Sequence, residues 1–449
     1  MPETKEFAEQ IIRTLREYDH QAYLVGGCVR DLLLGLEPAD YDITTDATPD
    51  EVMRIFPETY AVGAQFGVVL VPVRDVDGNT VEVATFRSDI GYSDGRHPDQ
   101  VRFSRSAQED VERRDFTING LLLDPVGNEV LDFVGGRKDL DAGIIRTIGR
   151  PELRFAEDKL RMLRAVRFAS RFGYTIEPET FAAIQKLAAG VRLISRERVR
   201  DELTKMLTEG HAREAFLLLD ETGLLREVLP EISAMKGVQQ PAQFHPEGDV
   251  FVHTLLLLQE LPHPCPPALA WGALLHDVGK PPTFRVAPDR IRFDNHVDVG
   301  VKMAEEICGR LRFSNDAAAQ VLALVANHMR FSHVPQMKDS TFKKFVRMPD
   351  FEEHLELHRL DCQASHRDLT SYSFTRKRIA AIPPETIRPA PLIGGADLIA
   401  AGYLPGPRFK EILSVVEDLQ LDGRLQSKDN AMEYVKREFP PQAGNSSEN

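Results

Sequence analysis

Asp40 and Asp42, two aspartates separated by a single residue, have the type and spacing of a metal-binding pair. They open a strand-like run, and side chains two positions apart on a strand point to the same face. Mg²⁺ prefers one or two such carboxylates together with substrate phosphates. Upstream, Gly26 and Gly27 join a strand-like run to a helical one, a turn where backbone amides approach phosphate closely, and Arg30 adds a forked cation. The combination predicts metal-dependent phosphoryl or nucleotidyl transfer.

A second group of ionisable residues lies in the stretch 154–173, whose apolar spacing predicts one helix that ends on a glycine. Asp158, Arg161, Arg164 and Arg167 recur every three residues and follow one broad face of that helix. Aspartate and arginine offer acceptors and donors to the edge of a nucleobase. A solvated charged face has the same pattern, so the residues alone leave both interpretations open.

A third group consists of histidines and aspartates in the C-terminal half. His276 and Asp277 are adjacent in GALLHDVGKPP, where a helix would let them share a cation while Lys280 stands beside a substrate phosphate. Imidazole and carboxylate ligands suit Mn²⁺, Ni²⁺ or Fe²⁺, as well as Mg²⁺. The other members of this set are, in chain order, His253, His296, His328 and Asp361.

These motifs together resemble the class II tRNA nucleotidyltransferase and bacterial poly(A) polymerase family. GGCVRD followed by DYD is similar to the family's glycine turn and catalytic aspartates. ERRDFTING (112–120) matches its arginine-arginine-aspartate motif, and EDKLRMLRAVRF (157–168) matches its nucleotide-selecting helix. The similarity is strong over about residues 20–240.

The resemblance implies a site and a mechanism. Mg²⁺ at Asp40 and Asp42 would activate the 3′-hydroxyl of an RNA primer for attack on the α-phosphorus of a nucleotide. Glu82, on the next strand-like run, is a candidate third carboxylate, although a half-buried strand glutamate is as often simply paired. The nucleotide-binding residues that the resemblance implies are Gly27, Arg30, Arg114, Asp158, Arg161, Arg164 and Arg167. The polar, glycine-rich segment 88–103 reads as a mobile loop, and it resembles the loop of members that add the full CCA sequence.

The histidine and aspartate set resembles the HD phosphohydrolase superfamily. His253, His276, Asp277 and Asp361 match its core ligands, and His296 and His328 match the extra ligands of two-metal members. Asp361 stands in the least distinctive context of the set. The resemblance implies phosphodiesterase or phosphatase activity on RNA ends. Further along, 391–425 looks like the C-terminal helical segment of the transferase family, and we expect Gly394-Gly395 to be a capped helix start.

The leading hypothesis is template-independent addition of CCA to the 3′ end of tRNA from CTP and ATP, with an appended HD hydrolase. An A-adding tRNA nucleotidyltransferase or poly(A) polymerase with the same active site is the first alternative. An HD hydrolase of nucleotides or RNA ends, with an N-terminal RNA-binding module, is the second. A pure scaffold would leave both ligand sets without a function.

The elements that position these residues are mixed at the N-terminus and helical afterwards. We therefore expect an α+β fold, a nucleotidyltransferase-type mixed sheet with helices followed by an all-α remainder that includes an HD domain. The expected strands are 23–27, 67–73 and 80–86, and the expected helices are 29–36, 49–56, 195–210, 213–229, 250–261, 267–276, 297–311 and 315–328. The expected divisions are a catalytic head (1–150), a nucleotide-selecting and RNA-binding neck (151–215), a helical body (216–385, with the HD domain at about 245–370) and a tail segment (386–449).

Composition sets the remaining limits. The 449 residues are 42% hydrophobic and 28% charged, which excludes collagen-like and wholly disordered proteins. Because the sequence has no long apolar run, we expect no membrane span, and because the N-terminus is polar, we expect no signal peptide. Four scattered cysteines fit a reducing cytoplasm. The net charge of −14 at first argues against RNA, but residues 137–213 hold 17 Lys and Arg against 11 Asp and Glu. No obligate protein partner is evident from the sequence.

Overall fold

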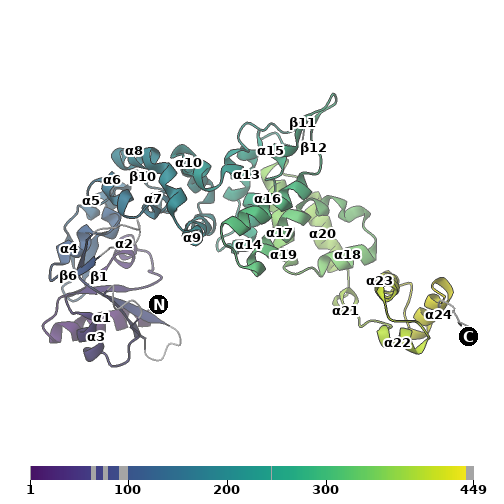
Figure 1. The fold of residues 1–449 in the computed structure, drawn as a ribbon, viewed down its shortest axis with the longest axis horizontal. Coiled ribbons are helices and arrows are strands. Elements are labelled where there is room, and N and C mark those ends of the chain that lie inside the picture. The colour runs from purple at the N-terminus through teal and green to yellow at the C-terminus, as the bar shows by residue number, and fades with distance from the viewer. Residues whose placement is uncertain (1, 62–66, 74–78, 91–99, 244, 441–449) are drawn as a thin grey trace, which may run out of the picture. The chain divides into compact units, whose positions relative to one another are not determined.

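The N-terminal strand-like runs form a six-stranded mixed sheet in the computed structural model, which describes residues 2–61, 67–73, 79–90, 100–243 and 245–440 (Figure 1). The strand order is β3-β4-β2-β1-β7-β8. β2 and β4 are parallel, and every other neighbouring pair is antiparallel. The strands are β1 (Ala22–Val25), β2 (Asp42–Thr45), β3 (Val68–Pro72), β4 (Thr80–Thr85), β7 (Leu121–Asp124) and β8 (Glu129–Asp132). The predicted mixed sheet is thus confirmed.

One long helix and several shorter ones accompany this sheet. α1 buries Ile11, Ile12 and Leu15, an apolar stripe at helical spacing, and packs on β1 and β2. α3 begins with a capping box in which Glu51 accepts hydrogen bonds from the backbone and hydroxyl of Thr48. The helices are α1 (Pro2–Glu17), α2 (Gly27–Leu33), α3 (Pro49–Ile55), α4 (Ala107–Glu112), the 3₁₀ turn η2 (Thr117–Asn119) and α5 (Gly136–Ala142).

The segment 88–103, expected to be one mobile loop, begins and ends as paired strands. β5 (Arg87–Ile90) and β6 (Gln100–Phe103) form an antiparallel pair in which Arg87 lies opposite Phe103. Residues 91–99 lie outside the described part of the chain. The ends of this segment are therefore held in register by backbone hydrogen bonds.

The helical part of the first unit differs from expectation at two positions. The expected helix 213–229 is two helices, Ala212–Glu221 and Leu224–Val228, because Gly223 between them adopts a left-handed φ of +76°. The predicted single helix over 154–173 is wrong at its start, because Asp158 is extended (φ −142°, ψ 108°) and separates two helices. Its Oδ1 accepts a hydrogen bond of 3.0 Å from the backbone N–H of Leu160, and an aspartate that caps a helix in this way also ends the preceding one. The elements here are α6 (Pro151–Glu157), α7 (Leu160–Phe172), α8 (Pro178–Leu187), η3 (Ala188–Leu193), α9 (Arg196–Thr208), α10 (Ala212–Glu221), α11 (Leu224–Val228), α12 (Pro230–Ser233) and the short parallel pair β9 (Ile144–Ile145) and β10 (Thr175–Ile176).

The second unit begins near residue 235 and is almost entirely helical. α14 is apolar on all sides and buries Trp271 and Leu274, so it lies at the centre of this unit. The elements are α13 (Val250–Gln259), α14 (Pro267–Leu275), α15 (Lys280–Thr283), β11 (Phe284–Val286), β12 (Ile291–Phe293), α16 (His296–Arg310), α17 (Asn315–Asn327), η4 (His328–Gln336), α18 (Asp339–Val346), α19 (Phe351–Ala364), α20 (Thr370–Ala380) and α21 (Pro384–Ile387).

The last described segment contains α22 (Gly395–Ala400), α23 (Pro407–Leu421) and α24 (Lys428–Glu438). Leu398, Ile412 and Val435 belong to one small apolar core. The backbone N–H of Gly394 donates to Asp397 Oδ2 at 2.8 Å, which confirms the predicted capped helix start. Among the described residues, no helix is long and apolar enough to cross a membrane.

Candidate functional site

Three carboxylates share one face of the sheet. Asp42 is the first residue of β2 and pairs in register with Glu82 on the parallel strand β4, while Asp40 lies two residues before it. Burial, together with the charges of Glu82 and Asp40, raises the pKa of Asp42 to about 7 against the opposing effect of Arg114. Carboxylates that repel one another at a substrate face fit a divalent cation, whose charge relieves that repulsion.

The glycine turn lies against one of the predicted arginines. Gly26 has a left-handed φ of +77°, and a Cβ at this position would lie 3.2 Å from Nη1 of Arg114. Arg114 Nη2 donates to Asp110 Oδ2 at 3.3 Å, and the hydroxyl of Thr44 on β2 donates to the same oxygen at 3.2 Å. The fully buried Asp110 thus fixes Arg114 between the turn and the carboxylates. Sequence analysis missed Asp110, because a buried aspartate in a short helix has no local signature.

Arg30, predicted to bind phosphate, lies inside the protein. It is only 4% exposed, and its guanidinium donates to Asp31 at 2.8 Å and to Asn119 Oδ1 at 2.6 Å. The rings of Phe168 and Phe172 on α7 lie 5.2 and 4.7 Å from its guanidinium carbon. In this structure Arg30 therefore joins α2 to α7, and its contact with phosphate stays a prediction.

Asp115 of the ERRD motif connects the head to α7. Its Oδ2 accepts from Arg164 Nε at 2.8 Å, and its Oδ1 accepts from Asn119 and from the backbone of Phe116. Burial opposes ionisation of Asp115, but Arg164 and these hydrogen bonds lower its pKa to about 2. Arg164 thus has an ionised partner within the protein.

Asp158 and Arg161, the pair predicted to select the nucleotide, are held by neighbouring side chains. Asp158 Oδ2 accepts from Arg198 Nη2 of α9 at 2.6 Å. Arg161 donates to Glu157 Oε2 at 2.6 Å and to the backbone carbonyl of Arg113 at 3.1 Å. Sequence analysis did not single out Arg198 or Glu157 as partners.

Arg167 does not join this group. It is 5% exposed and donates through Nε to Glu202 Oε2 at 2.7 Å. The structure therefore brings Arg161 and Arg164 to the ERRD motif, whereas Arg198 holds Asp158 and Arg167 is buried against α9.

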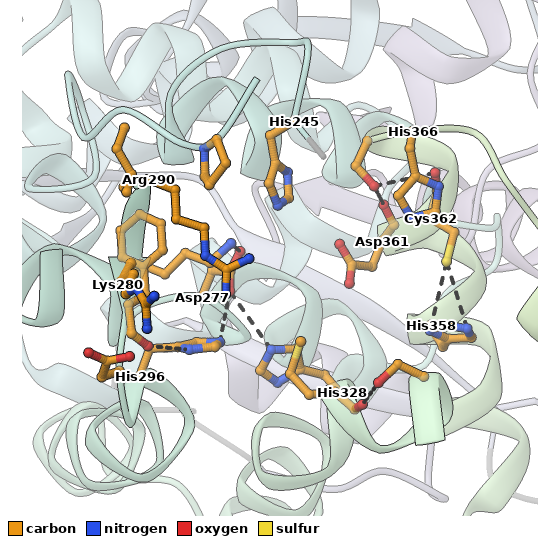
Figure 2. Close-up of a pocket in the computed structure, with 18 residues that line it drawn as sticks. His245, Asp277, Lys280, Arg290, His296, His328, His358, Asp361, Cys362 and His366 are labelled. Carbon is orange, nitrogen blue, oxygen red and sulfur yellow. Dashed lines mark hydrogen bonds and ion pairs between the residues drawn. The ribbon is translucent and has the colours of Figure 1, made fainter. Parts of the chain in front are cut away.

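The second site is organised around one aspartate. Asp277 directs Oδ2 to His276 Nε2 at 3.1 Å and to His253 Nε2 at 3.8 Å. Its other oxygen, Oδ1, lies 3.8 Å from Nε2 of both His296 and His328 (Figure 2). The two oxygens of Asp277 thus face two separate pairs of histidines, an arrangement that suits a carboxylate shared by two metal ions.

Asp361 completes the first of these clusters. Its Oδ1 lies 3.1 Å from His253 Nε2, so the residue with the least distinctive sequence context reaches the same place as the others. Its carboxylate comes from α19 and the imidazole of His253 from α13. All six predicted ligands therefore converge from five segments of the second unit.

The histidines are oriented as metal ligands. His276, His296 and His328 each donate Nδ1–H to the backbone carbonyl three residues earlier, at 2.8, 3.0 and 2.7 Å. That bond fixes the tautomer and turns the lone pair of Nε2 toward the cluster. Within the described residues, Nε2 of His296 and of His328 is buried without a hydrogen-bond partner, and burial lowers the pKa of His328 to about 4. Neutral imidazoles with unused buried lone pairs fit a divalent transition metal.

The HD dipeptide is not on a helix, which corrects the expectation for 267–276. α14 ends at Leu275, and His276 and Asp277 lie in the turn before α15. This turn packs tightly on α16, since a Cβ at Gly279 would lie 2.1 Å from the carbonyl oxygen of His296. Only glycine permits this approach, which places the two pairs of ligands side by side.

Three supporting residues were missed by sequence analysis. Glu247 Oε1 lies 2.8 Å from Nδ1 of His253 and 2.9 Å from Nδ1 of His245. Lys280, expected beside a substrate phosphate, donates to Asp277 Oδ2 and to Gln240 Oε1, both at 2.7 Å. A carboxylate within HPEGD and the histidine two residues before it were the available signals for Glu247 and His245, whereas Gln240 has none.

Three family models match the chain. They are the poly(A) polymerase head domain over residues 22–146, the probable RNA- and SrmB-binding site of polymerase A over 173–236, and the HD domain over 252–361. The N-terminal part thus matches the model of the poly(A) polymerase head-domain family. The HD match spans every predicted ligand from His253 to Asp361, and both domain types imply dependence on a divalent metal.

Similar proteins include CCA-adding enzymes. The chain is 46% identical to that of Bacillus subtilis over 218 residues, which are 49% of this chain and 54% of the relative. It is 47% identical to that of Geobacillus stearothermophilus over 214 residues, 48% of this chain and 52% of the relative. The chain thus spans about half the length of the curated relatives it matches.

A solved structure extends the likeness along the whole chain. The crystal structure of the Bacillus stearothermophilus CCA-adding enzyme in complex with CTP is 29% identical, with a TM-score of 0.73 over 97% of this chain and 98% of that chain. The similarity therefore reaches beyond the poly(A) polymerase head domain and supports the α+β assignment.

Proposed function

We propose that this chain adds CCA to the 3′ end of tRNA from CTP and ATP without a nucleic-acid template. The register pairing of Asp42 with Glu82, beside Asp40 and the glycine turn, is the observation that carries the proposal. The 46% identity to a CCA-adding enzyme and the likeness to one in complex with CTP favour this activity over an unrelated transfer reaction. Poly(A) addition is the nearest alternative, because the head-domain family is named for it.

In the proposed reaction, the 3′-oxygen of the RNA bonds to the α-phosphorus as the bond to the departing pyrophosphate breaks. Asp40, Asp42 and Glu82 would hold Mg²⁺, which activates the hydroxyl and neutralises charge on the triphosphate. Arg114 lies at the glycine turn, where it would contact phosphate oxygens. Gly27 would let a backbone amide do the same.

We assign selection of the nucleobase to α7 and to Asp158, which lies just before this helix. Asp158 and Arg161 would read the edge of cytosine or adenine, with Arg164 beside them toward the triphosphate. For Arg30 and Arg167 we propose a positioning role, since internal partners occupy both guanidinium groups.

For the second site we propose metal-dependent hydrolysis of phosphate esters at RNA ends. The proposed ligands are His253, His276, Asp277 and Asp361 for one ion, with His296 and His328 beside Asp277 for a second. Mn²⁺ or Ni²⁺ suits the histidine-rich sites, and Mg²⁺ suits the carboxylates. An active hydrolase without transferase activity remains the alternative of a different class.

The proposed divisions are a head (1–150), a neck (151–215), a body with the HD domain (216–385) and a tail segment (386–449). The ends of the head-domain and HD matches, at residues 146 and 361, support this organisation. The four cysteines are buried and form no disulfide within the described residues, which supports a reducing compartment, and we propose the cytoplasm.

One assay tests the transferase proposal. tRNA lacking its 3′ CCA is incubated with the full chain, Mg²⁺ and each labelled nucleotide in turn, and then with CTP and ATP together. We expect incorporation of C first and of A only after C. Incorporation of A without C would favour the A-adding alternative, and no incorporation would overturn the proposal.

A further inference from the structure

The cavity above Asp277 has a wall that the metal-binding cluster does not use. Its volume is about 520 Å³, within the range of small-molecule sites. β11 and β12 form an antiparallel hairpin in which Arg285 lies opposite Arg292, and the backbone N–H of Ala287 closes the turn on the carbonyl of Arg290. Arg290, Arg292 and Phe293 from this hairpin line the cavity.

The two sides of the cavity differ in charge. Figure 2 shows Arg290, Lys280 and His296 along one side, whereas His358 and His366 lie along the other. Lys280 is already bound to Asp277 and Gln240, so it offers little to a ligand. The cationic groups that remain on this side are therefore those of the hairpin.

Those two arginines share a single carboxylate. Arg292 donates Nη2 to Asp289 at 2.8 Å, and its Nε is buried without a hydrogen-bond partner in the described structure. Arg290 Nε lies 3.9 Å from the same Asp289, and the Arg290 side chain is 57% exposed. Asp294, which also lines the cavity, pairs with Arg285 at 2.7 Å, so the hairpin carries three arginines against Asp289 and Asp294. One positive charge therefore remains on the hairpin beside the proposed metal centre. Guanidinium groups bind phosphate in a forked geometry.

We propose that the hairpin wall, formed by Arg290 and Arg292, binds a second phosphate of the substrate while the metal centre binds the phosphate to be hydrolysed. The substrate class is then a nucleotide with phosphates on both sides of one nucleoside. A free nucleoside 3′,5′-bisphosphate and the 3′-phosphorylated end of an RNA share this chemistry. The inference rests on the proposed hydrolase function and names its substrate.

The test compares substrates that carry one phosphate with substrates that carry two. Full-length protein is assayed in Mn²⁺ with adenosine 3′,5′-bisphosphate, with adenosine 3′- and 5′-monophosphates, and with a short RNA ending in a 3′-phosphate. Arg290→Ala and the charge-preserving Arg290→Lys are compared with Lys302→Ala, which removes an exposed cation of α16 that does not line the cavity. Binding of the bisphosphate and the 3′-monophosphate is also measured by calorimetry in excess EDTA.

We expect Arg290→Ala to raise KM for the bisphosphate and the RNA about tenfold, as expected for loss of one charge-assisted hydrogen bond, and to leave KM for the monophosphates within about twofold. Arg290→Lys should be intermediate, Lys302→Ala should match the wild type, and calorimetry should show the same about tenfold loss for the bisphosphate alone. The difference between the effect of Arg290→Ala on the bisphosphate and its effect on the monophosphates should decrease at high salt, which screens the charge of Arg290.

The outcomes separate the two proposals. If the wild-type protein hydrolyses the substrates but Arg290→Ala changes KM equally for one and two phosphates, the second-phosphate site is wrong. If it hydrolyses none of them, the hydrolase proposal is wrong, and the binding measurement alone then decides whether the site exists. An effect on the RNA but not on the free bisphosphate would identify RNA ends as the source of the second phosphate.

Discussion

Asp42 and Glu82 lie opposite each other on the parallel strands β2 and β4, with their Cα positions in register. Parallel neighbours in register place both side chains on one face, and the preceding Asp40 has the same parity as Asp42. Burial and the two nearby carboxylates raise the pKa of Asp42 to about 7. The site is thus electrostatically strained until a cation is bound.

Asp42→Asn should therefore abolish most nucleotide addition. Removing one electrostatic stabiliser of a transition state costs about 10²–10³-fold in kcat, and Glu82→Gln should fall within the same range or below it. Incorporation of labelled CTP into tRNA lacking CCA measures both. Glu129→Gln, an exposed carboxylate at the start of β8, is the matched control and should retain full activity. A fully active Asp42→Asn variant would exclude the proposed site.

The same substitution should make the metal-free protein more stable at alkaline pH. A carboxyl whose folded pKa is about 7, above its unfolded value of 3.8, favours the folded state less as pH rises from about 4 to about 7. Above pH 7, Asp42→Asn removes the unfavourable buried charge, so its Tm in EDTA should exceed that of the wild type, with no such difference at pH 4. Mg²⁺ should raise the Tm of the wild type more than that of the variant. Equal pH profiles of the two proteins would contradict this account.

Selection of CTP over UTP should depend on Arg198, which we expect to act through Asp158 and not by contacting the nucleotide. Arg198 Nη2 donates to Asp158 Oδ2 at 2.6 Å. Arg198→Ala removes this hydrogen bond, so the carboxylate of Asp158 is no longer held in the single orientation that base recognition requires. One bidentate base contact is worth about 1–3 kcal/mol, so preference for CTP over UTP should fall by about tenfold or more while overall activity falls less. Competition between labelled CTP and UTP measures the ratio. Arg196→Ala, two residues away on α9, should leave it unchanged.

Local spacing was sufficient to propose candidate ligands, but it did not reveal the residues that hold them in place. Asp40 and Asp42, or His276 and Asp277, are neighbours in the chain, and their chemistry is visible in a few letters. The partners Arg198 and Gln240 are brought to the sites by tertiary packing, which leaves no local pattern. The break at Asp158 was also hidden, because apolar residues keep helical spacing across it and only the capping hydrogen bond shows that the helix restarts.

Glu247 should set the metal affinity of the HD site. It binds Nδ1 of His253 at 2.8 Å, and loss of such a supporting carboxylate typically weakens metal binding 10–100-fold. Glu247→Gln should show this loss in a competition titration with Mn²⁺ or Ni²⁺, with nucleotide addition unaffected. Glu260→Gln, exposed just beyond α13, is the control. Unchanged affinity in Glu247→Gln would show that the carboxylate does not act through His253.

Metal binding at the HD site should release a proton near neutral pH. Burial alone would lower the pKa of His253, but hydrogen bonds with Asp361 and Glu247 raise it to about 9. The stabilisation from this charged histidine is present below about pH 6.5 and is lost as pH rises through about 9. A metal must displace this proton, so affinity should increase with pH up to about 9. Calorimetry in two buffers of different ionisation enthalpy should give about one proton released per first ion, and none would contradict the protonated state of His253.

The two activities should be separable by single substitutions. The proposed carboxylates of the transferase site and the proposed ligands of the HD site belong to different compact units. His276→Ala removes a buried imidazole, proposed as a metal ligand, whose Nε2 lies 3.1 Å from Asp277 Oδ2, and it should abolish phosphate release while CCA addition continues. Asp42→Asn should abolish CCA addition and leave phosphate release intact. Intact phosphate release by this variant would show that its loss of nucleotide transfer is not a folding defect. If His276→Ala also lost nucleotide addition while its Tm stayed within a few degrees of the wild type, the two sites would be functionally coupled, and the proposal of two independent centres would be wrong.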